Sequence, residues 1–342
     1  MSGQTSAGDL RLGWSDVLQQ AWVGLGVDRM AGRVARLDRG WSTVLYEPAG
    51  TPVRVRNIGA DVAVGDWVLI SDDGERVEHV VPRYSGFTRR ASFEGSRAVA
   101  HTIAANLDVV VLVHALTAPP NQRRLERELV LAFDSGAAPV IVLTKRDLVD
   151  DPAASIAALE AVAVGVPVLC ASGVSGEGLD ELRAQVGDYQ TMALLGASGV
   201  GKSTLVNALT GRDAQRVADV REGDQRGRHT TTACELIALP DGHAWLIDTP
   251  GVRAVSLWSS GRGIEWAFAD VFDLSDHCRF RDCKHEDEPG CAVQAAIADG
   301  RLDARRLDAL KRLVAEEQAL EDEQRAHERA QDRRGVRKQR PR

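Results

Sequence analysis

The chain has 342 residues, of which 44% are hydrophobic and 27% charged, so it has material for two or three packed units. Its formal net charge of −7 argues against a generally basic nucleic-acid binder, and any RNA contact must come from local patches. No signal-peptide-like apolar segment precedes Arg11, and no apolar run is long enough to span a bilayer. We therefore expect a cytoplasmic protein with no membrane partner.

The first 88 residues divide into an N-terminal extension, residues 1–30, and a region of short β-like runs, residues 31–88. Within the extension, residues 14–22 are compatible with a short amphipathic helix. Five runs rich in β-branched residues, separated by polar turns that contain glycine, favour a small all-β barrel of the OB-fold type. These runs are residues 32–34, 42–46, 53–56, 66–70 and 77–81.

Arginines and aromatic residues are interleaved in this barrel region. Arginines can contact phosphates while aromatic rings stack on bases, so the pattern is compatible with RNA binding. A solvated barrel face, with the aromatic residues in the core, explains the same pattern equally well. The residues concerned are Arg33, Arg36, Arg39, Arg54, Arg56, Trp41 and Tyr46.

A guanine-recognition tetrapeptide follows the strand-like apolar run 139–143, and it consists of Thr144, Lys145, Arg146 and Asp147. The carboxyl end of such a strand is where α/β sheets bind ligands. The Asp147 carboxylate can accept hydrogen bonds from guanine N1–H and from its exocyclic amine, a donor pair that adenine lacks. Most such motifs begin with Asn. Thr144 has a hydroxyl where an amide would bond purine N7 and brace the phosphate loop, which predicts modest nucleotide affinity.

The phosphate loop comes later in the chain, after the short apolar run 192–195. It fits the pattern G-x-x-x-x-G-K-[ST] and opens a helix-like segment, so its backbone N–H groups can surround the β- and γ-phosphates. Between the two motifs, the strand-like run 167–171 ends at Ser172 and Gly173, which can contact the base. The loop and the residue after it are Gly196, Ala197, Ser198, Gly199, Val200, Gly201, Lys202, Ser203 and Thr204.

Phosphoryl-transfer chemistry assigns roles to two residues of this loop and two residues beyond it. We expect Lys202 to reach the phosphate oxygens and Ser203 to bind Mg²⁺. Asp248 ends the apolar strand-like run 245–248 and would hold the same ion through water. Gly251 would donate its backbone N–H to the γ-phosphate as part of switch II.

Residues 227–232 are the switch I candidate. A threonine of this segment would complete the magnesium shell, and we favour Thr231 over Thr230. In Ras-like enzymes a glutamine directly after the switch II glycine orients the attacking water, whereas this chain has Val252 there. Slow intrinsic hydrolysis is therefore predicted. His229 is the best internal candidate for positioning the water, and a solvated loop histidine is the alternative interpretation.

Three of the five cysteines lie close together with a histidine. Three thiolates and an imidazole within fourteen residues are enough for one closed tetrahedral Zn²⁺ site. A disulfide framework is disfavoured by the expected cytoplasmic location. His277 is adjacent to the first cysteine and could compete as a ligand. The cluster has the spacing Cys278-x4-Cys283-x-His285-x5-Cys291.

The C-terminal end combines a helical pattern with a basic tail. Apolar residues recur at helical spacing between residues 297 and 320. The last ten residues, 333–342, contain Arg or Lys at six positions and no acid. We expect the tail, residues 331–342, to be disordered when free. The sequence leaves two roles open for this tail: contact with rRNA, and keeping the protein soluble.

The base-recognition motif precedes the phosphate loop, whereas an ordinary GTPase has these motifs in the opposite order. This order, the sequence Gly-Arg-His-Thr-Thr-Thr at 227–232, Asp-Thr-Pro-Gly-Val at 248–252 and the later Cys/His cluster together resemble the RsgA/YjeQ family. Members of that family are circularly permuted GTPases that depend on the small ribosomal subunit. The resemblance covers nearly the whole chain, and its metal pattern selects His285 over His277.

The resemblance implies a multidomain protein: an OB-fold RNA-binding barrel (31–88), a circularly permuted α/β P-loop GTPase domain (98–254) and a helical zinc module (255–330). It further implies hydrolysis of GTP to GDP with Mg²⁺, one structural Zn²⁺, rRNA binding and a role late in maturation of the small ribosomal subunit, as a monomer. The residues alone leave open a GTPase acting on another RNA or translation component, or a GTP-dependent RNA-binding module with little turnover. The intact Lys202, Ser203 and Asp248 argue against the last.

Overall fold

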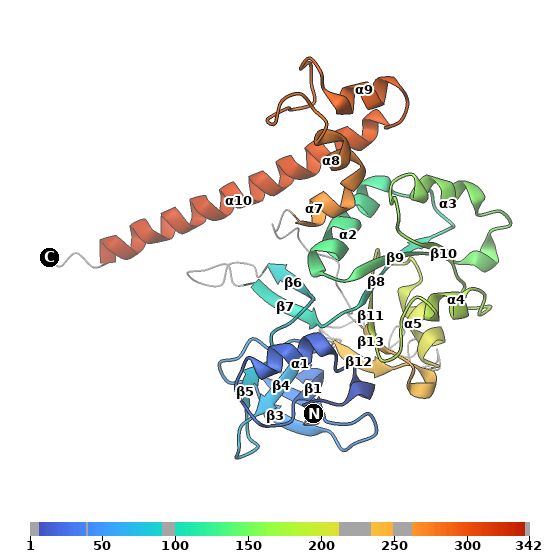
Figure 1. Ribbon diagram of the computed structural model, residues 1–342. Helices are drawn as coiled ribbons and strands as arrows, with labels where there is room; N and C mark the ends of the chain where they lie inside the picture. The colour runs from blue at the N-terminus through green and yellow to red at the C-terminus, as the bar shows by residue number, and fades with distance from the viewer. Residues whose placement is uncertain (1–6, 39, 91–99, 212–233, 249–261, 339–342) are drawn as a thin grey trace, which may run out of the picture.

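The computed structural model describes residues 7–38, 40–90, 100–211, 234–248 and 262–338. Figure 1 shows a small β-barrel near the N-terminus, a central sheet flanked by helices, and a C-terminal helical module from which one long helix projects. Within the described ranges, no helix combines the length and the apolar character that crossing a bilayer requires. The three regions follow one another in the chain, as the predicted multidomain architecture requires.

The N-terminal barrel confirms all five predicted strands. Antiparallel pairing runs in the order β3-β2-β1-β4-β5, and a parallel bridge between Arg56 and Arg76 closes the ring. Alternate side chains point inward, so a small core of valines such as Val34, Val44 and Val68 fills the barrel. The strands are β1 (Gly32–Asp38), β2 (Trp41–Leu45), β3 (Val53–Arg56), β4 (Trp67–Ile70) and β5 (Val77–Val80).

The segment before the barrel packs against it through a short helix, α1 (Asp16–Val23). The helix begins after Ser15, whose hydroxyl oxygen accepts a hydrogen bond from the Leu18 N–H at 3.4 Å. Leu18 is fully buried, and the ring of Trp14 meets the ring of Trp67 edge to face at 4.8 Å. The helix predicted in the N-terminal extension is therefore confirmed.

The central sheet has the strand order β10-β9-β8-β11-β13-β12, in which only β12 is antiparallel to its neighbour β13. A separate two-stranded hairpin of β6 and β7 leads from the barrel into this sheet (Figure 1). The strands are β6 (Gly86–Arg90), β7 (Ala100–Ala105), β8 (Val109–Ala115), β9 (Ala138–Thr144), β10 (Val168–Cys170), β11 (Thr191–Gly196), β12 (Glu235–Ala238) and β13 (Trp245–Asp248).

The central sheet is buried on both faces, because helices cover each side. Val110 and Leu112 of β8 join one core with α2 and α3, while Val111 and Val113 join a second core with α4 and α5. Strands covered on both faces appear in the sequence as continuous apolar runs rather than as alternating ones. The covering helices are α2 (Gln122–Ser135), α3 (Ala153–Glu160), α4 (Leu179–Arg183) and α5 (Lys202–Thr210).

The barrel is joined to the central sheet by backbone pairing and by one buried guanidinium. Strand β12 pairs with β1, with Arg36 opposite Glu235. Arg33 is only 1% exposed, and its guanidinium donates to the Leu12 carbonyl and, at 2.7 Å, to Thr191 Oγ1. The sequence left a phosphate contact and a solvated barrel face open for Arg33, and the structure fits neither, because β1 directs this side chain into the junction between the two regions.

The C-terminal module is held to the central domain mainly by contacts with α2. The Gly263 N–H donates to Asp134 Oδ1 of α2 at 2.7 Å, and the rings of Phe133 and Trp266 stack with centroids 6.2 Å apart. A second contact joins Arg312 to Glu126 at 2.6 Å. The helices of the module are α7 (Arg262–Ala267), α8 (Ala269–Ser275), α9 (Ala292–Ala298) and α10 (Ala304–Lys338).

The last helix, α10, extends well beyond the body of the protein (Figure 1). The prediction that the tail 331–342 is disordered is wrong as far as Lys338, because α10 continues to that residue; residues 339–342 lie outside the described part. The second half of the helix is rich in Ala, Glu, Gln and Arg, which are strong helix formers. A pair one turn apart, Glu321 and Arg325 at 2.7 Å, adds local support.

Candidate nucleotide and metal sites

The predicted phosphate loop lies between β11 and α5, where a buried strand ends and a helix begins. Two glycines have steric reasons to be there: Gly201 has a φ of +98°, and a Cβ on Gly196 would lie 2.4 Å from the Val113 carbonyl oxygen. Lys202 Nζ donates to the carbonyl of Gly196 at 2.8 Å, so the ammonium group lies over the loop. Ser203 and Thr204 follow in the first turn of α5. The loop therefore presents its N–H groups at a helix N-terminus, as anion binding requires.

Thr144 contacts this loop from the neighbouring end of β9. Its hydroxyl is within hydrogen-bonding distance of the Val200 carbonyl in the phosphate loop and, at 3.1 Å, of the His114 carbonyl at the end of β8. The side chain is 2% exposed, so this contact is shielded from water. The sequence predicts modest nucleotide affinity because a hydroxyl replaces the usual amide here. In the structure that hydroxyl contacts the phosphate loop, and the affinity stays a prediction.

The base-recognition residues gather at the same edge of the sheet. Asp147 lies in a short 3-10 helix, Arg146–Leu148, which follows Lys145 in the left-handed conformation. Ser172, fully buried, donates from Oγ to Asp147 Oδ1 at 2.5 Å and accepts the N–H groups of residues 174 and 175 at 3.1 Å. The Asp147 carboxylate is thus held by a side chain that is itself fixed by the backbone. A Cβ on Gly173 would lie 2.8 Å from the Thr204 carbonyl, so this turn approaches α5 closely.

Of the predicted switch residues, the structure describes Asp248 and not the others. Asp248 ends β13, which pairs in parallel with the phosphate-loop strand β11. Thr231, His229 and Gly251 lie outside the described residues. The structure therefore brings together the phosphate loop, the base-recognition motif and Asp248 at the carboxyl ends of the parallel strands β11, β9 and β13.

The Cys/His cluster forms a compact group in the C-terminal module. The candidate ligand atoms of Cys278, Cys283, His285 and Cys291 all lie within 4.8 Å of one another. The Sγ atoms of Cys278 and Cys291 are 3.9 Å apart, and a tetrahedral Zn²⁺ with Zn–S bonds of about 2.3 Å requires an S–S distance of about 3.8 Å. His277 instead directs Nδ1 to the Asp273 carbonyl at 2.9 Å. The cluster therefore has the composition and spacing of a zinc site, with His285 as its histidine.

Ser275 supports this cluster, and the sequence analysis did not identify it. Its hydroxyl donates to the Val271 carbonyl at 2.8 Å and is 3.1 Å from His285 Nε2. Because the hydroxyl proton is already used, Ser275 Oγ accepts from His285 Nε2–H, which leaves Nδ1 as the ligand atom. Nδ1 lies 3.5 Å from Cys291 Sγ, on the side of the other ligands. No sequence pattern marks Ser275, since the contact depends on the turn between α8 and the metal loop.

The match to known proteins agrees with this geometry. A family model described as RsgA GTPase matches residues 80–258, and a model described as 50S ribosome-binding GTPase matches residues 191–330. The small ribosomal subunit biogenesis GTPase RsgA of Methanosarcina acetivorans is 40% identical over 312 residues, which cover 89% of this chain and 84% of that protein. The RsgA protein of Streptomyces coelicolor is 42% identical over 325 residues, covering 90% and 86%.

Solved structures show the same architecture. YjeQ from Thermotoga maritima superimposes with a TM-score of 0.62 at 25% identity, covering 84% of this chain and 98% of that one. YloQ, described as a circularly permuted GTPase, gives a TM-score of 0.59 at 26% identity, with coverage of 84% and 95%. Together with the order of motifs along the sheet, these matches define a circularly permuted GTPase, an enzyme that hydrolyses GTP. The chain belongs to the RsgA family.

Proposed function

We propose that this GTPase acts in maturation of the small ribosomal subunit, in the cytoplasm and as a monomer, with hydrolysis stimulated by that subunit. The observation that carries the proposal is the identity of 40% across 89% of the chain to a protein named for small ribosomal subunit biogenesis. The presence of a barrel, a GTPase sheet and a Cys/His cluster in one chain supports it.

For the nucleotide, the proposal assigns the roles expected from phosphoryl-transfer chemistry. Lys202 and the N–H groups of residues 196–204 would bind the β- and γ-phosphates, and Asp147 with the turn at Ser172 and Gly173 would bind guanine. Thr144 would act through the phosphate loop, because its hydroxyl contacts the Val200 carbonyl rather than facing solvent.

For the metal ions, Ser203, Thr231 and Asp248 would hold Mg²⁺ with the nucleotide, and Gly251 would contact the γ-phosphate. Mg²⁺ supplies positive charge against the phosphate oxygens. Cys278, Cys283, His285 and Cys291 would hold one structural Zn²⁺ that fixes the loop before α9. His229 is the internal group proposed to position the attacking water.

Contact with rRNA is proposed on the barrel face around Trp41. The guanidinium groups of Arg54 and Arg56 lie 5.0 and 5.1 Å from the centre of its ring, and all three side chains come from β2 and β3. This arrangement offers cations for phosphates next to an aromatic surface for a base. Arg36 is exposed on the adjacent strand β1, whereas Arg39 lies outside the described residues.

The test is co-sedimentation of the full chain with purified ribosomal subunits. The protein, loaded with a non-hydrolysable GTP analogue or with GDP, is centrifuged with small subunits, with large subunits or alone. We expect it to pellet with small subunits in the triphosphate state and not with large subunits. Equal binding to both subunits, or to neither, would contradict the proposal.

A further inference from the structure

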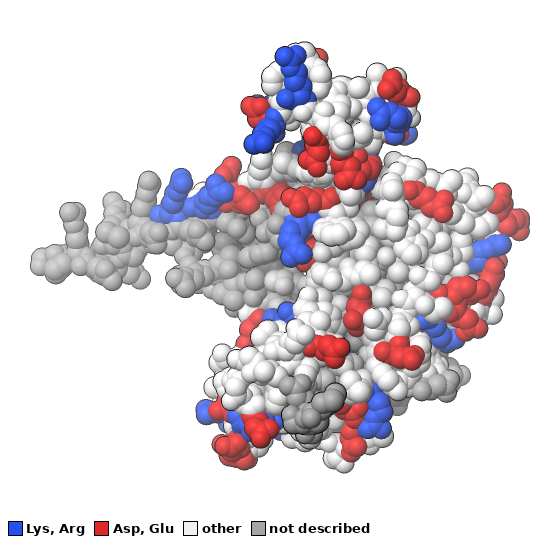
Figure 2. Space-filling model, in the orientation of Figure 1, with Lys and Arg blue, Asp and Glu red and all other residues white. Residues whose placement is uncertain are grey.

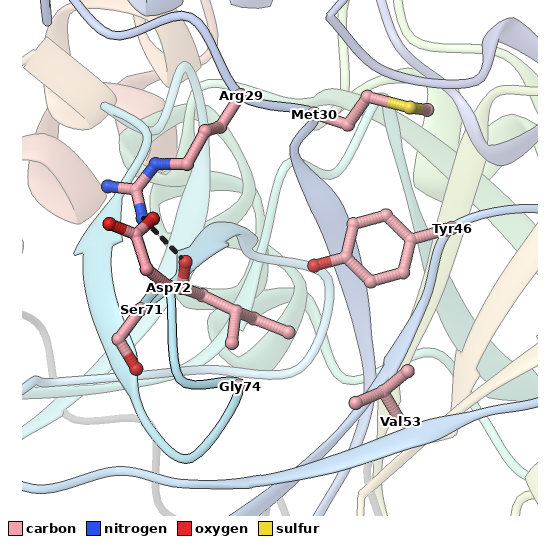
Figure 3. Close-up of a pocket in the computed structure, with 8 residues that line it drawn as sticks. Arg29, Met30, Tyr46, Val53, Ser71, Asp72 and Gly74 are labelled. Carbon is pink, nitrogen blue, oxygen red and sulfur yellow. Dashed lines mark hydrogen bonds and ion pairs between the residues drawn. The ribbon is translucent and has the colours of Figure 1, made fainter.

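The barrel has a second surface that differs in chemistry from the face around Trp41. An open hollow lies where the segment before β1 meets the ends of β2 and β4 and the start of β3. Figure 3 shows its lining side chains, with the Tyr46 ring between Met30 and Val53 and its hydroxyl directed toward the β4–β5 loop. No nucleotide or metal residue discussed above lies in it.

The floor of the hollow exposes apolar side chains. Met30 is 57% exposed and Val53 is 37% exposed, and both line the hollow together with the partly buried Tyr46 and Ile70. Exposing these apolar side chains to water costs free energy. Burying them under an apolar side chain of a partner would recover that free energy. The hollow therefore suits an inserted aliphatic or aromatic side chain.

One polar group in the hollow has no partner among the described residues. The Tyr46 hydroxyl makes no hydrogen bond to another described side chain or backbone group, and burial raises the pKa of this phenol. A half-buried phenolic O–H ordinarily finds a hydrogen-bond partner. The hydroxyl is not among the buried polar atoms that lack a partner, so it is open to solvent, and an incoming backbone carbonyl would replace water as its acceptor.

The rim of the hollow is acidic, although an arginine lines it. The Arg29 guanidinium is already occupied, because it donates to Asp72 at 2.9 Å, to Glu78 at 2.5 Å and to the Ile70 carbonyl at 2.9 Å. Residues 71–78, of which Ser71, Asp72 and Gly74 line the hollow, contain four acids and one base, so with Arg29 the formal charge of this segment is −2. The Asp72 side chain is 92% exposed and able to meet a cation. This surface repels phosphate groups and attracts Lys and Arg.

We propose that this hollow is a docking site for a lysine- or arginine-rich segment of a protein partner, with one apolar side chain inserted between Met30 and Val53. Cationic side chains on either side of the anchor meet Asp72 and the other acids of the β4–β5 loop. The partner's backbone accepts from Tyr46. The charge beside the hollow favours a basic peptide over RNA, so the barrel presents two surfaces of different chemistry to two kinds of partner.

The test uses the full zinc-loaded chain and fluorescein-labelled peptides, with binding followed by fluorescence anisotropy. The probe has the sequence Lys-Lys-Leu-Lys-Lys, a matched peptide has Gly in place of Leu, and a labelled uridine oligonucleotide reports RNA binding. The leucine peptide is expected to bind more tightly than the glycine peptide by about fivefold, the effect of burying one to two methylene equivalents.

Three variants locate the site. Met30→Ser is expected to weaken the leucine peptide about fivefold, and Asp72→Asn about twofold, the size of one exposed ion pair. Asp180→Asn is the control, because Asp180 is also 92% exposed and also pairs with an arginine, but lies on α4. GTP turnover should be unchanged in all three.

The proposal is overturned if the leucine peptide does not bind, if both peptides bind equally, or if Asp180→Asn weakens binding as much as Asp72→Asn. Loss of oligonucleotide binding in Met30→Ser would likewise overturn it, by showing that the hollow takes RNA.

Discussion

At the residue scale, the nucleotide site depends on a threonine hydroxyl that joins the base-recognition strand to the phosphate loop. Thr144 is buried, and the Val200 carbonyl would lose its shielded donor if the hydroxyl were removed. Thr144→Val keeps the shape of the side chain and removes only this donor. We expect GTP and GDP affinity to fall by about 1–3 kcal/mol, the cost of a buried unsatisfied polar group.

The measurement for Thr144→Val is a nucleotide titration by calorimetry. Thr210→Val is a useful comparison, because Thr210 ends α5 and its hydroxyl donates within the same helix to the Val206 carbonyl at 2.7 Å. Full affinity in Thr144→Val would show that the phosphate loop holds its shape without the hydroxyl.

Asp147 is predicted to determine the choice of base. Its carboxylate is oriented by Ser172 Oγ at 2.5 Å, so an amide at this position would sit in the same place. Asp147→Asn should weaken GTP binding by about 2–4 kcal/mol, because two charge-assisted contacts are lost, and should improve binding of xanthosine triphosphate. Competition titrations with the two nucleotides measure both effects. Unchanged GTP affinity would remove Asp147 from the base site.

At the element scale, the metal loop is shaped by its ligands and by one supporting hydroxyl. Cys283→Ser should release the bound zinc and loosen the loop before α9, while GTP binding stays largely intact because the sites lie on separate units. Ser275→Ala should leave the four ligands in place but reduce zinc affinity about 10–100-fold, since it removes the acceptor that orients His285.

Zinc content by elemental analysis and zinc affinity by competition with a chelator test these two variants. Ser135→Ala is a matched control, because Ser135 also ends a helix and its Oγ donates to the Ala132 carbonyl of α2 at 2.6 Å, away from the metal cluster. Protein purified without chelators that contains no zinc would count against the metal assignment, and wild-type zinc affinity in Ser275→Ala would remove that residue from its supporting role.

Secondary structure was predictable where the pattern of apolar residues alone determines the element. The parallel strands are long apolar runs because helices bury both of their faces, and the barrel strands carry β-branched residues between glycine turns. The helix α10 was missed at its end because a run of positive charge suggested disorder, whereas the residues before it are strong helix formers. Charge predicts solvation, and it does not by itself predict an unfolded backbone.

The positions and contacts of individual side chains were less predictable from the sequence. Arg33 belongs to a strand with other arginines, but its guanidinium lies at the junction and contacts Thr191, 158 positions away in the chain. The Ser275–His285 and Thr144–Val200 contacts likewise depend on tertiary structure. The motifs themselves were visible because phosphate and zinc binding demand fixed residue types at short spacing.

At the scale of the whole molecule, the barrel, the GTPase sheet and the metal module are joined through specific elements. Strand β12 connects the sheet to β1 of the barrel, and α2 contacts both α7 and α10 of the metal module. The same helix reaches the nucleotide edge, because Glu128 of α2 lies 2.9 Å from His114 at the end of β8. The barrel and the metal module therefore each contact an element that adjoins the nucleotide site.

The most direct test of the central claim is GTP turnover by the full chain alone, with purified small subunits and with purified large subunits. We predict that small subunits raise turnover at least about tenfold, about 1.4 kcal/mol in activation free energy. Val252 cannot position the attacking water, so the intrinsic rate should be low. His229→Ala should lose most of the stimulation while keeping GTP affinity, and wild-type stimulation in that variant would point to a ribosomal group instead. Equal turnover with small subunits, with large subunits and without either would contradict the account.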